Sequence, residues 1–207
     1  MIAIVDYGLG NVSAFLNVYK RLNVKAFIAK DRKELTKAQK IVLPGVGGFD
    51  QAMYLLQSSG MKEVLNELVL EREIPVLGVC VGMQIMAESS DEGSAAGLNW
   101  IKGEVRSLNA DLKFEKHPLP HMGWNEISIK SEDELFNGLK DRPQFYFLHS
   151  YHFVCSDENT SIGTANYGID INCIVKSRNI YGVQFHPEKS HHNGVSLLKN
   201  FSNLNCA

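Results

Sequence analysis

The chain has 207 residues, of which 44% are hydrophobic and 21% charged, and its formal net charge at pH 7 is −2. This length and composition predict one soluble globular domain, residues 1–207, whose core needs no disulfide framework. The nearly balanced charge gives no electrostatic reason to expect binding to nucleic acid or to an acidic membrane surface.

The cysteines and the N-terminus indicate the expected compartment. No two of the four cysteines form a CxxC pair, so we expect reduced thiols in a cytoplasmic protein, at Cys80, Cys155, Cys173 and Cys206. The N-terminal stretch MIAIVDYGLGN has a short apolar run without a preceding basic region, which predicts a strand and not a signal peptide. No apolar stretch approaches the ~20 residues of a membrane helix.

The first half of the chain alternates strand-like and helix-like patterns. Short apolar runs predict strands at 2–6, 24–29, 40–45 and 74–80. Apolar residues at helical spacing predict helices at 12–22, in two stretches within 49–72, and at 81–89. Uninterrupted apolar strands separated by helices indicate an α/β fold with a mostly parallel central sheet covered on both faces.

The second half of the chain has a different pattern of predicted elements. After Gly93 the chain contains short strand-like segments joined by brief turns, and the helical pattern returns only at 194–204. We therefore expect antiparallel strands that extend the parallel sheet. No linker, repeat or low-complexity segment divides the chain.

Cys80 stands in the sequence GVCVGMQ at the predicted junction of a strand and a helix. The spacing Gly78-x-Cys80-x-Gly82 is that of a nucleophile elbow with sulfur in place of oxygen. Such a sharp turn needs flanking glycines and exposes its central side chain at the C-terminal edge of the sheet, where ligands bind. The N-terminus of the following helix would favour a thiolate.

A thiol nucleophile needs a base, a group that orients the base, and donors for an oxyanion. His186 and Glu188 follow a predicted strand, and residues two apart in an extended segment point to the same side, so Glu188 could reach the imidazole. The glycine-rich turn LPGVGGF (43–49) could supply one backbone N–H to an oxyanion hole, and Val81 could supply the other.

These motifs together resemble the class I (triad) glutamine amidotransferases. PGVG (44–47), GVCVGMQ (78–84) and HPE (186–188) occur in that order and on the expected elements. Four further segments resemble the glutaminase subunit of imidazole glycerol phosphate synthase, an enzyme of histidine biosynthesis: VDYGLGNV (5–12), PHMGWNEI (120–127), FYFLHSYHF (145–153) and VQFHPEKS (183–190). The resemblance covers about residues 2–202 and implies the class I glutamine amidotransferase fold.

The resemblance implies a catalytic assignment. Cys80 would attack the side-chain amide of L-glutamine and form a thioester, His186 would transfer protons, and Glu188 would orient His186. The backbone N–H groups of Gly47 and Val81 would face the oxyanion. No cofactor and no metal are implied.

The resemblance also implies a substrate pocket and a partner surface. The positions that match substrate-binding residues are Gln84, Glu92, His149, Ser150 and Tyr151. The positions that match the surface where ammonia leaves are Met122, Trp124 and Lys189. The partner would be a (β/α)8-barrel cyclase subunit that forms a heterodimer with this chain and receives the ammonia.

Several alternatives remain open at the level of sequence. The same motifs also resemble a paralog that supplies ammonia to a sugar-amidating partner in surface-polysaccharide biosynthesis, and a catalytically silent partner-binding subunit is a third reading. Gly8-x-Gly10 with Asp31 weakly resembles a dinucleotide fingerprint, but Ser13 occupies the third glycine position. Four side chains that could bind a metal lie close together in the sequence, but their spacing matches no known zinc pattern: His186, Glu188, His191 and His192.

Overall fold

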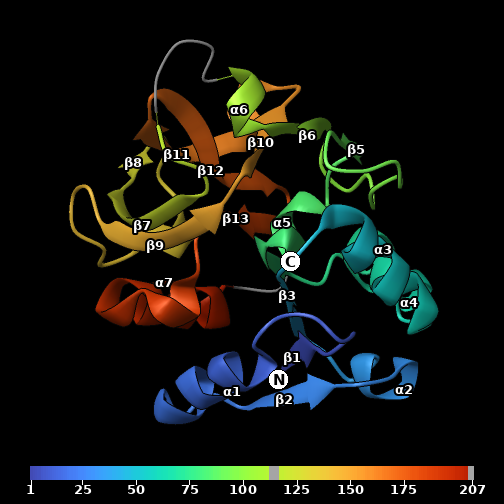
Figure 1. Cartoon of the computed structure of the whole chain (residues 1–207). Coiled ribbons are helices and arrows are strands. Elements are labelled where there is room, and N and C mark those ends of the chain that lie inside the picture. Colours follow the sequence, from blue (N-terminus) through green and yellow to red (C-terminus); the bar gives the residue numbers. More distant parts are fainter. Residues whose placement is uncertain (112–116, 205–207) are drawn as a thin grey trace.

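The computed structural model describes residues 1–111 and 117–204. Cys206, expected to have no role in the chemistry, lies outside these ranges. The described residues form a central mixed sheet with strand order β2-β1-β3-β4-β13-β12-β10-β6-β5, in which β11 also pairs with β12 and β8 pairs with β11 (Figure 1).

One half of the central sheet is parallel. It consists of β1 (Ile2–Val5), β2 (Ala26–Ala29), β3 (Lys40–Gly45), β4 (Val76–Cys80) and β13 (Ile180–Val183). Every residue of β1, β4 and β13 is buried, as expected for parallel strands covered on both faces. β13, which is remote in sequence, lies beside β4 and brings the HPE segment to the same edge as Cys80.

Helices cover both faces of the parallel strands. α1 (Val12–Arg21) contacts α7 (His191–Asn203), whereas α3 (Phe49–Ser58) and α4 (Lys62–Asn66) lie on the other side of the sheet in Figure 1. A π-helical turn, η1 (Glu67–Glu71), continues α4, and the short α2 (Arg32–Leu35) precedes β3. Within the described residues, no helix combines the length and apolar character that crossing a membrane requires.

The other half of the sheet is largely antiparallel, which confirms the predicted α/β class with antiparallel strands added late in the chain. It contains β5 (Ser89–Ser90), β6 (Gly103–Ser107), β8 (Ser128–Ile129), β10 (Tyr151–Cys155), β11 (Ser161–Tyr167) and β12 (Ile169–Ser177). Short helical turns connect them: α6 (Leu108–Asp111), η2 (Glu134–Phe136) and η3 (Glu158–Thr160).

A separate two-stranded sheet pairs β7 (His121–Glu126) with β9 (Gln144–His149) in antiparallel register. Because side chains alternate along a strand, one face of this ribbon turns inward and the other outward. Phe145, Phe147 and His149 are buried, and the two phenylalanines pack against Phe185 between β13 and the HPE segment. The aromatic contacts therefore hold the HPE segment and β9 together.

The helix predicted for residues 81–89 is wrong in length. α5 contains only Val81–Gln84, and the chain then turns toward β5. The carbonyls of residues 85–88 accept hydrogen bonds from the N–H groups of residues 97–101 instead of continuing the helical ladder. A tertiary contact with a later segment thus ends the helix after one turn.

The nucleophile elbow depends on close backbone packing. Cys80 has φ +55°, a left-handed conformation that is strained for a residue with a side chain. A Cβ placed on Gly82 would lie 1.9 Å from the carbonyl oxygen of Leu43 in β3, and one on Gly78 would lie 2.6 Å from the carbonyl oxygen of Gly82. The glycines let the elbow pack directly on the neighbouring strand.

We predict that Gly82→Ala lowers the free energy of unfolding by about 3 kcal/mol or more, because the added methyl group has no space beside Leu43. Urea denaturation followed by circular dichroism measures this change. Gly48→Ala is the matched control, since its Cβ would meet nothing nearer than Glu92 at 3.6 Å. Equal loss of stability in both variants would contradict the prediction.

Candidate active site

Cys80 lies at the carboxyl end of β4, between the ends of β3 and β13. Its side chain is among those that line a cavity of about 300 Å³, a size at the lower end for small-molecule sites. The lining residues come from six segments of the chain: Val46, Gly47, Cys80, Val81, Gln84, Glu92, Pro120, Leu148, His149, Ser150, Tyr151, His186 and Lys189. The tertiary fold thus brings most of the predicted site residues to one hollow.

His186 lines the cavity with Cys80 and is bonded to Glu188 behind it. The Nδ1 atom of His186 lies 2.9 Å from Oε1 of Glu188, and both side chains are about 4% exposed. The backbone N–H of His186 donates to the carbonyl of Tyr146, and the hydroxyl of Ser190 donates to the carbonyl of His186. These bonds fix the imidazole at the wall that faces the sulfur.

The contact between His186 and Glu188 exists, but not through the predicted geometry. The segment is not extended: Pro187–Lys189 forms a 3-10 turn, η4. The turn folds the Glu188 carboxylate back onto the imidazole, and Gly194 of α7 lets the turn approach, since a Cβ there would lie 1.9 Å from the Pro187 carbonyl oxygen. Alternation along a strand was therefore the wrong reason for this contact.

The electrostatics of the pair favour a charged imidazole. Burial lowers the pKa of His186, but the Cys80 sulfur and the Glu188 carboxylate more than offset it and raise the pKa to about 9. At neutral pH His186 is therefore an imidazolium, and it lies between the Cys80 sulfur and the Glu188 carboxyl group. Such a pair can hold a thiolate ready for attack and can donate a proton to a leaving group.

Gly47 and Val81, the two residues predicted to form an oxyanion hole, both line the cavity. Val81 is the first residue of α5, so its N–H has no acceptor within the helix, and Gly47 occupies a left-handed turn with φ +89° at the rim of the cavity. The hydroxyl of Tyr7 donates to the carbonyl of Pro44 at 2.9 Å and thus braces the strand that leads into this turn. No motif in the sequence indicates this contact of Tyr7.

All five residues matched to glutamine binding line the cavity: Gln84, Glu92, His149, Ser150 and Tyr151. Glu92 also has a structural contact, because its Oε2 accepts the N–H of Phe49 at 2.8 Å at the start of α3. The carboxylate therefore joins the glycine-rich turn to the opposite wall, and its second oxygen is left for a ligand.

Gln84 contacts Gln184, a residue that is not among the predicted site residues. Its Nε2 donates to the carbonyl of Tyr151 at 3.0 Å and to Oε1 of Gln184 at 3.1 Å. Gln184 is completely buried, and its own Nε2 lies 3.8 Å from the sulfur of Cys80. The sequence contains one indication of this contact, because Gln184 is a polar residue in the apolar run at the end of β13. A buried amide there requires hydrogen-bond partners.

Two buried histidines continue this polar contact. His149 Nδ1 donates to the Tyr151 carbonyl, and His121 Nδ1 lies 2.9 Å from His149 Nε2. Burial, reinforced by His121, lowers the pKa of His149 to about 3, and burial lowers the pKa of His121 to about 4. Both rings are therefore neutral at physiological pH.

The three residues matched to the partner surface are exposed. Met122 and Trp124 point outward from β7 and are 64% and 47% exposed, and the exposed Lys189 lines the cavity mouth. Trp124 stacks on His191 with ring centroids 5.1 Å apart. Of these three residues, only Lys189 contributes to the cavity itself.

The rival readings of the sequence find no structural support. In the described part of the chain, no three metal-ligating side chains gather, and His191 stacks on Trp124 rather than joining His186. A Cβ on Gly10 would lie 2.8 Å from the Pro44 side chain, so packing explains the glycine of the turn that resembles a dinucleotide fingerprint.

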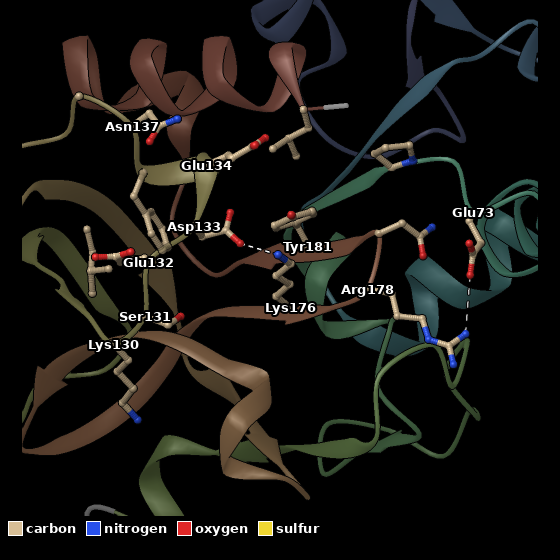
Figure 2. A pocket seen from close by; sticks show the side chains of 16 residues that line it. Glu73, Lys130, Ser131, Glu132, Asp133, Glu134, Asn137, Lys176, Arg178 and Tyr181 are labelled. Atoms are coloured by element: carbon tan, nitrogen blue, oxygen red, sulfur yellow. Dashed lines mark hydrogen bonds and ion pairs between the residues drawn. The ribbon is translucent and has the colours of Figure 1, made fainter. Parts of the chain in front are cut away.

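A larger hollow of about 1160 Å³ lies at the opposite end of β4 and β13, where Pro75 and Asn179 border it. Figure 2 shows two ion pairs among its charged side chains, Lys176 with Asp133 and Arg178 with Glu73. Its lining contains neither cysteine nor histidine within the described residues. The described lining therefore offers no thiol and no imidazole for the chemistry that the sequence predicts.

We predict that His121 and His149 make the fold sensitive to acid. Unfolded histidines bind protons below a pKa of about 6.5, whereas the folded pair stays neutral down to about pH 4. The unfolded state therefore binds more protons in this range, and the free energy of unfolding falls as the pH drops. Substituting both residues (His121→Gln with His149→Gln) should flatten this dependence in urea melts at several pH values.

The exposed His192 provides a control. His192→Gln should keep the wild-type dependence on pH. A double variant that loses stability in acid as steeply as the wild type would contradict the assignment.

Comparisons with known proteins agree with this geometry. The chain matches the family described as "Glutamine amidotransferase class-I" over residues 3–204. It is 52% identical over 204 residues to "Imidazole glycerol phosphate synthase subunit HisH" from Leptospira borgpetersenii and equally identical to the protein of that name from Bdellovibrio bacteriovorus, with 99% of this chain and 100% of each relative covered.

A solved structure described as a glutamine amidotransferase superimposes with a TM-score of 0.75 at 16% identity, covering 98% of this chain and 99% of its own, which supports the fold. The family match and the relatives span nearly all of the chain that carries the elbow and the cavity. This chain therefore belongs to the class I glutamine amidotransferases and, within them, to the family of imidazole glycerol phosphate synthase subunit HisH.

Proposed function

We propose that the chain hydrolyses L-glutamine to glutamate and ammonia, as the glutaminase subunit of imidazole glycerol phosphate synthase in histidine biosynthesis. The observation that carries the proposal is the elbow cysteine, which shares one cavity with a buried His186–Glu188 pair. This combination of nucleophile, base and orienting carboxylate is that of covalent acyl transfer.

In the first half of the reaction, the Cys80 thiolate attacks the carbonyl carbon of the glutamine side-chain amide. The carbonyl oxygen becomes an oxyanion, which the N–H groups of Val81 and Gly47 stabilise. When the tetrahedral intermediate collapses, the C–N bond breaks and the His186 imidazolium gives its proton to the departing nitrogen. A raised pKa of about 9 suits His186 to this role, because the ring is protonated at neutral pH.

In the second half, the deprotonated His186 accepts a proton from water, and the hydroxide attacks the thioester. The C–S bond breaks, which releases glutamate and restores the thiolate. The bond to Glu188 keeps the proton on Nδ1 and leaves Nε2 for chemistry. The sum of the two halves is glutamine plus water to glutamate plus ammonia.

The cavity has groups suited to glutamine. The Glu92 carboxylate can accept the substrate ammonium group, and the carbonyl oxygen of the Gln84 amide is left to accept a hydrogen bond because both Nε2 contacts are internal. His149, Ser150 and Tyr151 line the same cavity. Neutral His149 adds no positive charge that would repel an ammonium group.

The surroundings of the cavity support a partner docked over its mouth. Five exposed apolar side chains, here called the mouth patch, come from the cavity lining and from residues 119–124, which also supply Pro120 to the lining: Val46, Leu119, Met122, Trp124 and Leu148. Val46 and Leu148 also line the cavity, so a partner that covers the mouth patch would receive ammonia before it reaches water. We propose that this partner is a (β/α)8-barrel cyclase subunit.

The relatives bear on the alternatives. Proteins 52% identical to this chain are named as subunits of imidazole glycerol phosphate synthase, which favours that acceptor over a sugar-amidating partner. The intact Cys80, His186 and Glu188 argue against a silent subunit. Rescue of a histidine auxotroph that lacks this subunit tests the acceptor directly.

We predict that a diazo-ketone analogue of glutamine adds one label per chain, on Cys80. Peptide mass spectrometry locates the label, and Cys80→Ala should abolish it. Cys155 and Cys173 serve as internal controls, because burial raises the pKa of Cys155 to about 12 and also raises that of Cys173. Labelling of either residue in place of Cys80 would refute the nucleophile assignment.

We predict that Trp124→Ala weakens binding of the cyclase subunit about tenfold or more, since large aromatic side chains dominate interface energies. Isothermal titration with the purified partner measures the affinity. Leu70→Ala is the control, because Leu70 is similarly exposed (49%) but precedes β4 at the opposite edge of the sheet. An unchanged affinity of the Trp124→Ala variant would show that the partner does not bind at the mouth patch.

A further inference from the structure

A buried glutamine lies beside the proposed nucleophile. Gln184 follows β13 directly, is 0% exposed, and places its Nε2 3.8 Å from the Cys80 sulfur. Cys80 itself is only 5% exposed, so a thiolate there has little access to water. A buried anion needs hydrogen-bond donors in place of the water it has lost.

The orientation of Gln184 is fixed by a carbonyl on the neighbouring wall. The backbone oxygen of Tyr151 can only accept, so the Gln84 atom 3.0 Å away must be the amide nitrogen. The same nitrogen lies 3.1 Å from the Gln184 side chain, which must therefore present its oxygen. The Gln184 amide nitrogen is thus turned toward the sulfur.

The Tyr151 carbonyl is itself held from a second side. It accepts from His149 Nδ1 at 2.9 Å, so His149 Nε2 is an acceptor and takes the Nδ1 proton of His121. His121 Nε2 in turn faces the Asn125 amide at 3.2 Å. Every polar atom along this path has one consistent role, which prevents the glutamines from turning around.

We propose that Gln184 is a positioning residue for the nucleophile, donating its side-chain N–H to the Cys80 thiolate and thereby stabilising the charged sulfur. The titratable groups that interact with the sulfur are His186 and Tyr7. The elbow helix α5 has a single turn, so its dipole is a weak source of stabilisation, and the Gln184 amide adds an uncharged donor to the charge of the His186 imidazolium. This proposal rests on Cys80 being the nucleophile. A structural role limited to satisfying Gln84 would leave the thiolate unaffected.

The test is the pH dependence of Cys80 alkylation by iodoacetamide in the full chain, because the thiolate is the reactive form. Gln184→Met has a similar volume but no donor. It should raise the midpoint of the profile by about one pH unit and slow alkylation below the midpoint about tenfold. Peptide-resolved mass spectrometry separates Cys80 from the other thiols.

Gln184→Asn is a second variant in case the methionine variant does not fold. It keeps a buried amide but is one methylene shorter, so its nitrogen withdraws from the sulfur, and the midpoint should rise in the same direction. Asn179→Leu is the matched control. Asn179 donates to the carbonyls of Val69 and Ile74 at the opposite end of β13, so its loss should lower the melting temperature without moving the Cys80 midpoint.

Midpoints within about 0.2 pH units of wild type in the folded Gln184 variants would overturn the proposal. The two assignments fail separately. Labelling by the glutamine analogue at a residue other than Cys80 would refute the assignment of Cys80 as the nucleophile. Labelling at Cys80 together with an unshifted pH profile of alkylation would refute only the role of Gln184.

Discussion

The contact between the backbone of Gly82 and the carbonyl of Leu43 is the constraint on which the site depends. β4 can end in a strained Cys80 only because the first residues of α5 press against β3 without side chains between them. That approach places the Cys80 sulfur, the Val81 N–H and the glycine-rich turn after β3 at one edge of the sheet. Packing energy from the surrounding core holds the strained backbone in place.

A second constraint acts on the polar side of the cavity, where the carbonyl of Tyr151 accepts from both Gln84 and His149. One acceptor of fixed character sets the direction of the hydrogen bonds on two paths, one to Cys80 and one to His121. The charges follow the same division. His186 is protonated between the sulfur and Glu188, whereas His149 and His121, without an anionic partner, are neutral. Histidines within one region therefore differ in charge because their partners differ.

Sequence periodicity and motif spacing anticipated the alternating strands and helices, the elbow at Cys80 and the involvement of His186 and Glu188. The prediction from periodicity failed where a later segment of the chain bonds to the same backbone carbonyl groups. Residues 85–88 have a helical pattern, but segment 97–101 takes their carbonyls. The expected alternation along a strand also gave the wrong geometry for Glu188, which reaches His186 through a 3-10 turn. Local patterns record local preferences and contain no information on distant hydrogen-bond donors.

The sequence by itself determined the fold class, the identity of the nucleophile candidate and the family, because glycine spacing, apolar runs and the HPE motif are properties of contiguous residues. Only the tertiary structure decided that Gln184 faces the sulfur, that His121 and His149 are a neutral pair, and that the exposed Val46 and Leu148 line the cavity with Cys80. Those features join residues from β7, β9, β10 and the end of β13. Their proximity results from strand register and packing, so it becomes visible only once the chain is folded.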